Sequence, residues 1–179
     1  MACLKKLDQD IMFDCAGFVL TGGTGEIDEA IVINSSDIST ISESGGVGTI
    51  TMITGKKGFT INSVNNSVMY QDAIKVNDTV PTAEDQSVVI KVMSSVDSTT
   101  YRLALTSLLK GNFRVALKSK SGNYYLAGAF CGLEASDFAT DSSTGGISTV
   151  TLKTPEASTG DMLVTLTKAV YDGLKTPKV

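Results

Sequence analysis

Short runs of apolar and β-branched residues, separated by Gly, Asn, Ser or Asp, recur along most of this 179-residue chain. The clearest is Val47–Thr54 (VGTITMIT), which alternates strictly, as expected of a strand whose successive side chains point to opposite faces of a sheet. Ile147–Lys153 and Asp161–Lys168 repeat this pattern near the C-terminus. Runs of this kind predict a sheet of short strands joined by turns, and therefore a mainly β fold.

Two hairpins are expected among these strands. Phe113–Lys118 and Asn123–Phe130 give the stronger pattern, with the turn at Ser119–Gly122. Val47–Thr54 is expected to turn back into Phe59–Val64 as a second hairpin. Both predictions rest on alternating runs that are close together in the sequence.

The other segments are less regular. Glu134–Gly146 is polar and rich in Ser, Thr, Gly and Asp, which predicts a loop. Val68–Asn77 could form a strand or a helix, and its β-branched neighbours favour a strand. Further strands are expected at Glu29–Asn34 and Gln86–Ser94, which brings the total to about eight.

One segment, from about Ser98 to Lys110, has the period of a helix. Asp97 or Ser98 can cap its N-terminus, and Gly111 follows its last turn. Its apolar residues form one stripe, so the helix should lie against the sheet: Tyr101, Ala104, Leu105, Leu108 and Leu109.

The predicted fold class is mainly β (α+β), an antiparallel β-sandwich or barrel of about eight strands with one packed α-helix. The length suits a single domain over residues 1–179. Residues 1–16 are expected to form an N-terminal arm, and residues 169–179 a C-terminal tail that could include a short helix.

Composition argues against common enzyme chemistry. The chain has no histidine, which excludes a Ser-His-Asp triad, a Cys-His pair and any zinc site that uses histidine. Its cysteines, Cys3, Cys15 and Cys131, match neither a disulfide framework nor a metal site. Ser107 and Lys110 fit a Ser-x-x-Lys pattern, but its supporting motifs are missing. We expect no catalytic residues, cofactor or metal.

Charge is unevenly distributed along the chain. The first 50 residues carry two basic and eight acidic side chains, a net charge of −6. Two groups stand out as candidate surfaces. One is an acidic cluster, Glu26, Asp28 and Glu29, and the other is a basic group, Arg102, Lys110, Arg114, Lys118 and Lys120.

Each charged group has two interpretations. The acidic cluster is either a solvated strand entry or part of an acidic surface that DNA passes without binding, because phosphates are repelled. The basic group is either a solvated surface or an inter-subunit face that meets the acidic part of a neighbouring copy head to tail. No run is basic enough to bind nucleic acid specifically.

Residues 1–15 lack the apolar segment of a signal peptide, and no stretch approaches the roughly 20 apolar residues of a membrane helix. We therefore expect a protein that is made in the cytoplasm and does not insert into membranes.

The order of short motifs resembles the tail tube (major tail) structural proteins of tailed bacteriophages, especially those of phages and prophages of gut Bacteroidota. The resemblance covers residues 10–170 or so. The motifs that carry it are Phe13-Asp14-Cys15, the strand ending in Asn34, Asp37-Ile38, Gly55-Lys56-Lys57-Gly58-Phe59, Leu126-Ala127-Gly128-Ala129-Phe130-Cys131-Gly132-Leu133, Gly145-Gly146, and Thr149-Val150-Thr151-Leu152-Lys153-Thr154-Pro155-Glu156.

This resemblance implies a subunit of hexameric rings that stack into a hollow, DNA-conducting tube. Its partners would be copies of itself and other tail proteins (tape measure, terminator and baseplate), and DNA would pass without specific binding. Its location would be the virion tail, assembled in the bacterial cytoplasm. The segments expected to bridge rings are Gly17–Gly25, Ile41–Gly48 and Glu134–Gly146.

Two alternatives remain open. The chain could be another virion protein, such as a head decoration or capsid-associated subunit. It could also be a non-viral β-domain that binds a ligand or carbohydrate. Only 11 aromatic residues and no tryptophan weigh against a carbohydrate site.

Overall fold

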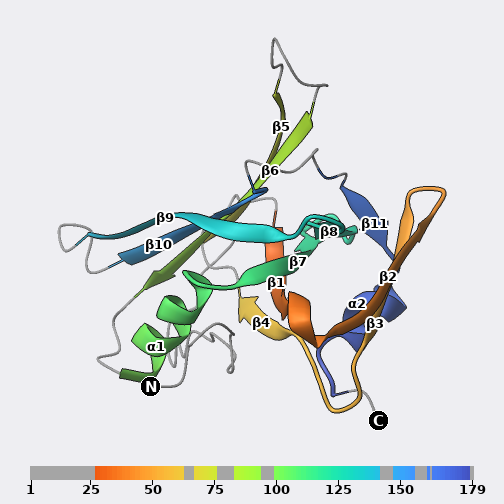
Figure 1. The fold of residues 1–179 in the computed structure, drawn as a ribbon, viewed down its shortest axis with the longest axis horizontal. Coiled ribbons are helices and arrows are strands. Elements are labelled where there is room, and N and C mark those ends of the chain that lie inside the picture. The colour runs from red at the N-terminus through yellow and green to blue at the C-terminus, as the bar shows by residue number, and fades with distance from the viewer. Residues whose placement is uncertain are drawn as a thin grey trace.

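The structure, a computed structural model, describes residues 27–62, 67–75, 83–93, 99–141, 147–155, 161 and 163–177. It has the predicted mainly β fold, with eleven strands and two α-helices in this part of the chain (Figure 1). The predicted N-terminal arm, the Gly17–Gly25 loop, Glu26 and the Asp97/Ser98 cap lie outside the described residues. The strands are β1 (Ile27–Asn34), β2 (Ile38–Ser44), β3 (Val47–Met52), β4 (Phe59–Asn62), β5 (Val68–Lys75), β6 (Ala83–Met93), β7 (Asn112–Ser119), β8 (Tyr124–Ala127), β9 (Leu133–Asp141), β10 (Ile147–Lys153) and β11 (Val164–Leu166), and the helices are α1 (Thr99–Leu108) and α2 (Lys168–Gly173).

The strands form one mostly antiparallel sheet in the order β2-β3-β11-β8-β7-β9-β10-β6-β5, and only β11 and β3 pair in parallel. β1 leaves this path and pairs with both β7 and β4. β8 pairs with the second half of β7, whereas β9 pairs only at Asn112 and Phe113. The sheet therefore has two parts that meet at β7, one continuing through β8 and the other through β9. Figure 1 shows β9 and β10 extending to the left, β5 at the top, and β2 and β3 on the right.

β1 is buried on both faces. Five consecutive residues, Ala30–Asn34, are buried, and the four apolar ones alternate between two hydrophobic clusters. Ala30 and Val32 belong to one cluster, and Ile31 and Ile33 to the other. A strand covered on both faces is expected to have a continuous apolar run instead of an alternating one, and this explains the sequence of β1.

α1 covers the first cluster, as its apolar stripe predicts. Ala104, Leu105 and Leu108 are buried there against residues of β1, β6, β7 and β10. The predicted packed helix is therefore confirmed, and it ends at Leu108.

α2 covers the second cluster, on the other side of β1 (Figure 1). The Thr167 hydroxyl accepts a hydrogen bond from the Val170 N–H and caps the helix. Tyr171 and Leu174 are fully buried. The segment expected as a tail is therefore a second packed helix, fixed to the fold by burial of its apolar side chains.

Two hairpin predictions have different outcomes. The hairpin of β7 and β8 is confirmed, with its turn after Ser119. The pairing of Val47–Thr54 with Phe59–Val64 is wrong, because β4 pairs with β1 and β3 pairs with β2 and β11. Gly45 and Gly46 both have positive φ, as a tight two-residue hairpin turn requires. They join β2 to β3, so β3 forms its hairpin with β2 and not with β4. The predicted Ile41–Gly48 loop is therefore part of a hairpin.

The predicted loop Glu134–Gly146 is also wrong over most of its length. β9 pairs with β10 from Glu134 to Asp141, and residues 142–146 lie outside the described part of the chain. Most of β9 is solvent-exposed on both faces, Ala135 being an exception. Polar residues suffice on such a strand, which is why its sequence has the composition of a loop.

Candidate functional site

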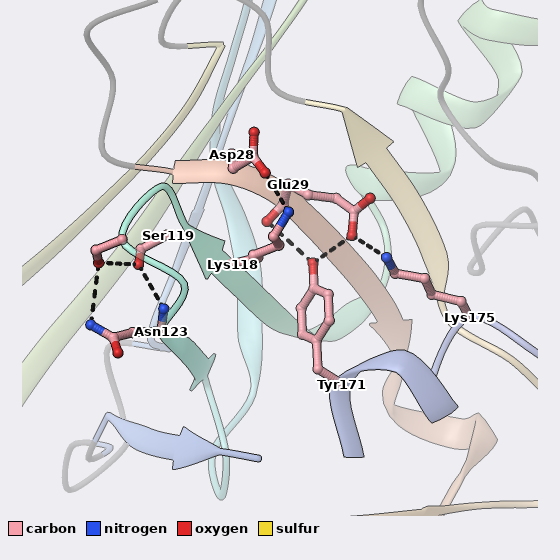
Figure 2. Close-up of polar contacts among 8 residues, drawn as sticks. Asp28, Glu29, Lys118, Ser119, Asn123, Tyr171 and Lys175 are labelled. Carbon is pink, nitrogen blue, oxygen red and sulfur yellow. Dashed lines mark hydrogen bonds and ion pairs between the residues drawn. The ribbon is translucent and has the colours of Figure 1, made fainter. Parts of the chain in front are cut away.

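Two of the three predicted acidic residues, Asp28 and Glu29, lie at the start of β1, where its pairing with β7 is irregular. Ile27 pairs with Ser119 and Glu29 with Lys118, so Asp28 is an extra residue in the ladder. A bulge of this kind redirects side chains that would otherwise alternate. It allows the adjacent Asp28 and Glu29 both to reach the side of the sheet that carries Lys118 (Figure 2).

Asp28 and Lys118 form an ion pair within the chain. Lys118 Nζ lies 2.5 Å from Asp28 Oδ2, and this hydrogen bond raises the pKa of the Lys118 ammonium. Both side chains are partly exposed, so the pair contributes only about 0.2–1 kcal/mol to stability. It nevertheless joins, in one molecule, two charges that the head-to-tail hypothesis assigns to neighbouring copies.

Glu29 holds the C-terminal helix. Its Oε1 accepts a hydrogen bond of 3.0 Å from the Tyr171 hydroxyl and lies 2.5 Å from Lys175 Nζ. The Tyr171 ring lies 4.9 Å from the Tyr124 ring and 5.1 Å from Lys175 Nζ. We call Glu29, Tyr171 and Lys175 the α2 latch, and Figure 2 shows them converging from β1 and the C-terminal segment.

The latch keeps Tyr171 as a hydrogen-bond donor. Burial raises the pKa of the Tyr171 hydroxyl far above its ordinary value, and the negative charge of Glu29 adds to this effect. Tyr171 therefore stays protonated over the whole physiological range. The role of this cluster is to hold α2 against β1.

The predicted basic residues do not share one role. Arg114 donates hydrogen bonds to the carbonyls of Ala129 (3.5 Å) and Phe130 (3.1 Å), and burial lowers the pKa of its guanidinium. Lys110 and Lys120 are exposed. Arg102 lies on α1, where its side chain is outside the description.

Arg114 belongs to a second polar cluster around the turn between β8 and β9. We call residues Gly128–Gly132 the Phe130 turn. Asp161 Oδ2 accepts hydrogen bonds of 2.8 Å from the main-chain N–H groups of both Phe130 and Cys131. Gln86 Oε1 accepts another, also 2.8 Å, from the Gly128 N–H. Asp161 and Gln86 are both buried, so the turn rests on buried polar groups.

The backbone of the Phe130 turn depends on glycine at both ends. Gly128 and Gly132 have φ values of +69° and +74°, a region that other residues rarely adopt. A Cβ atom at Gly132 would lie 2.0 Å from Asn112 Oδ1. The turn is thus specified by both conformation and close packing, and it leaves Phe130 52% exposed.

Sequence reasoning did not identify several residues of these clusters. Tyr171 and Lys175 follow Thr167, whose capping pattern and apolar spacing give a local clue to α2. The Gly-x-x-x-Gly spacing of Gly128 and Gly132 suggests a tight turn. Nothing local identifies Gln86 or Asp161, because their partners are 42 and about 30 residues away.

The described residues contain no group of three or more acidic or cysteine side chains arranged to hold a metal ion. Neither described helix has the length and apolarity required to cross a membrane. Comparison of the chain with protein-family models, with curated proteins and with solved structures gives no match. The described part of the chain presents strand edges, the exposed Phe130 turn and a groove between β3 and α2.

Proposed function

We propose that the protein is a structural subunit of a phage tail tube, which assembles with copies of itself into stacked rings through which DNA passes. The order of short motifs that resembles tail tube proteins suggests this role. The observation that carries the proposal is the set of unpaired strand edges at the ends of the sheet.

These edges are long. Among the described residues, β2 pairs only with β3, and β5 only with β6. Within the same part of the chain, β9 pairs only with β10 beyond Glu134. An unpaired edge presents main-chain N–H and C=O groups that can bind a strand of another chain.

The edges carry little of the common protection against pairing, and the lysine of β5, Lys75, lies at the very end of that strand. β2 (ISTISES) contains no lysine and no proline, the residues that most often prevent association at an edge. On β5, Met69 is 39% exposed, and Gln71, Asp72 and Ala73 are exposed as well. Pairing between copies would satisfy these groups and extend the sheet from one subunit to the next.

In this role the remaining partners are other tail proteins, and the protein resides in the virion tail. The formal charge of −4 suits a tube that conducts DNA, because like charge keeps the phosphates from adhering. Asp28 and Glu29 are paired within the molecule, so a surface that repels DNA would depend on the other acidic residues of the chain.

The test is direct observation of assembly. The purified protein is examined by negative-stain electron microscopy and analytical ultracentrifugation over increasing concentration. We expect rings of uniform diameter that stack into tubes with a central channel. A protein that stays monomeric at all concentrations, also when co-produced with the neighbouring virion proteins, contradicts the proposal. Co-purification with capsids and not with tails would instead support a head decoration subunit.

A further inference from the structure

Phe130 is the most exposed large hydrophobic side chain among the described residues, at 52%. Its turn is unusually well fixed. In addition to the bonds that Asp161 and Gln86 accept and those that Arg114 donates, the Gly132 N–H donates to the Gly128 carbonyl at 3.1 Å. Asn112 Nδ2 donates to the Cys131 carbonyl at 3.4 Å.

Such rigidity has a consequence for binding. A side chain held on a fixed backbone loses little conformational entropy when a partner covers it. Aromatic side chains presented in this way are frequent anchors of protein–protein interfaces. Folding uses buried polar groups here to hold a turn whose main apolar side chain stays in solvent, which indicates that Phe130 is presented to a protein partner.

The same chain has a groove of suitable shape elsewhere. It lies between β3 and α2, has a volume of about 410 Å³, and its apolar walls include Ile50, Met52, Val170 and Leu174. A cavity of about 150 Å³ already accommodates a benzene molecule in a protein interior. The groove therefore has room for the phenyl ring of Phe130 and part of its turn.

Neither surface brings an unpaired charge to the contact. No charged side chain lines the groove, and the charged groups at the turn, Arg114 and Asp161, are already hydrogen-bonded to its main chain. Bringing them together would remove no unpaired charge from water, which is the main penalty that polar surfaces impose on association.

We infer that Phe130 of one copy inserts into the β3–α2 groove of the next copy. The inference rests on the self-assembly of the proposed function and names one of its contacts. Phe130 and the groove belong to different parts of the surface, so the contact joins two unlike surfaces and is heterologous. Heterologous contacts give rings when the rotation closes and filaments when it does not.

A photo-crosslinking experiment tests the contact. p-Benzoylphenylalanine is incorporated at position 130 of the full chain, isotopically labelled and unlabelled protein are mixed and assembled, and crosslinked peptides are mapped by mass spectrometry. We expect mixed-isotope crosslinks to peptides that contain residues 50–52 or 169–177. The same probe at Phe138, also an exposed aromatic at 41%, is the matched control and should not reach these peptides. Crosslinks from position 130 that stay within one chain, that map elsewhere, or that are missing from assembled particles overturn the inference.

Two substitutions separate this contact from folding. Phe130→Ala should raise the concentration required for half-maximal assembly by at least about tenfold. Lys153→Ala, at an exposed site on β10, which has a neighbouring strand on each side, should not. Gly173→Leu adds a side chain at the groove, where a Cβ atom meets nothing within 4 Å. It should impair assembly while the melting temperature stays equal or rises, since leucine favours helix more than glycine does.

The outcomes distinguish the two proposals. If the wild type assembles and both variants assemble as well as it does, the contact of Phe130 with the groove is wrong and the tube proposal stands. If the wild type never self-associates, both are wrong.

Discussion

Glu29 lies near the start of β1, and its carboxylate contacts Tyr171, 142 residues later in the chain. In the sequence it is one of three clustered acids and suggests a charged surface. In the folded protein Lys175 compensates its negative charge, and its Oε1 accepts a hydrogen bond from the Tyr171 hydroxyl. The residue therefore anchors the C-terminal helix.

At this scale, pH provides a test. The unfolded chain releases the Tyr171 proton above about pH 10, whereas the folded chain retains it because the pKa of the buried hydroxyl is raised. The free energy of unfolding should therefore fall as pH rises above 10, by up to about 1.4 kcal/mol per pH unit from this group. Tyr171→Phe removes this dependence and, at pH 7, costs about 1.5 kcal/mol for the lost hydrogen bond to a carboxylate.

Urea denaturation of wild type and Tyr171→Phe between pH 7 and 11 measures both effects. The difference between the two proteins should shrink above pH 10. Tyr125→Phe, on the neighbouring strand β8, is the matched control. Parallel pH profiles for wild type and Tyr171→Phe would show that the latch does not hold the Tyr171 proton.

Among the elements, β1 connects the two cores. Val32 is buried in the cluster under α1, and its neighbour Ile31 in the cluster under α2. β7 shares this property over a shorter stretch, with Leu117 in the first cluster and Ala116 in the second, whereas β10 buries alternate residues only. Because β1 contributes to both cores, it should tolerate substitution on neither face.

Alanine substitutions at adjacent positions of β1 test this difference. Ile31→Ala should destabilise the protein by about 2–5 kcal/mol, as for other buried isoleucines. Val32→Ala should cost at least about 1.5 kcal/mol, since it also removes a fully buried side chain. Thr40→Ala, at an exposed site on β2, should cost less than about 1 kcal/mol. Equilibrium unfolding gives all three values, and a near-neutral result at either β1 position would contradict two-sided burial.

At the scale of the whole molecule, the sheet is continuous but open. Its two terminal strands, β2 and β5, do not pair with each other among the described residues. Within the described residues, the outer edges of these two strands have main-chain groups that are not paired with another strand. The proposed ring closes this sheet between subunits.

A charge on an edge strand should separate assembly from folding. Met69→Lys places a lysine on β5, where an ammonium disfavours edge pairing. It should change the free energy of unfolding by less than about 0.5 kcal/mol, because the site is exposed. Disfavouring edge pairing by about 1 kcal/mol would raise the concentration for half-maximal assembly about fivefold.

Thr165→Lys is the control for this experiment, because Thr165 is exposed on β11, which has neighbours on both sides. Sedimentation velocity of both variants against wild type gives the assembly thresholds. Equal thresholds for Met69→Lys and wild type would show that the β5 edge is not used.

Local physics determined much of this protein from sequence alone. The alternation in β3 and β10, the apolar stripe of α1 and the β7–β8 hairpin depend on residues close together in the chain, so periodicity and turn chemistry predict them. The same holds for the mainly β class. β9 escaped prediction because both of its faces lie largely in solvent and impose no apolar pattern.

Only the tertiary structure decided which distant groups meet. The pairing of β4 with β1, the ion pair of Asp28 with Lys118, and the Asp161 carboxylate beneath the Phe130 turn join segments far apart in sequence. Such contacts depend on how the whole sheet folds around its two cores, and no local pattern in the sequence encodes this arrangement. The sequence predicts strands, one helix and clustered charge, whereas the fold pairs Glu29 with the C-terminal segment and leaves Phe130 exposed on a fixed turn.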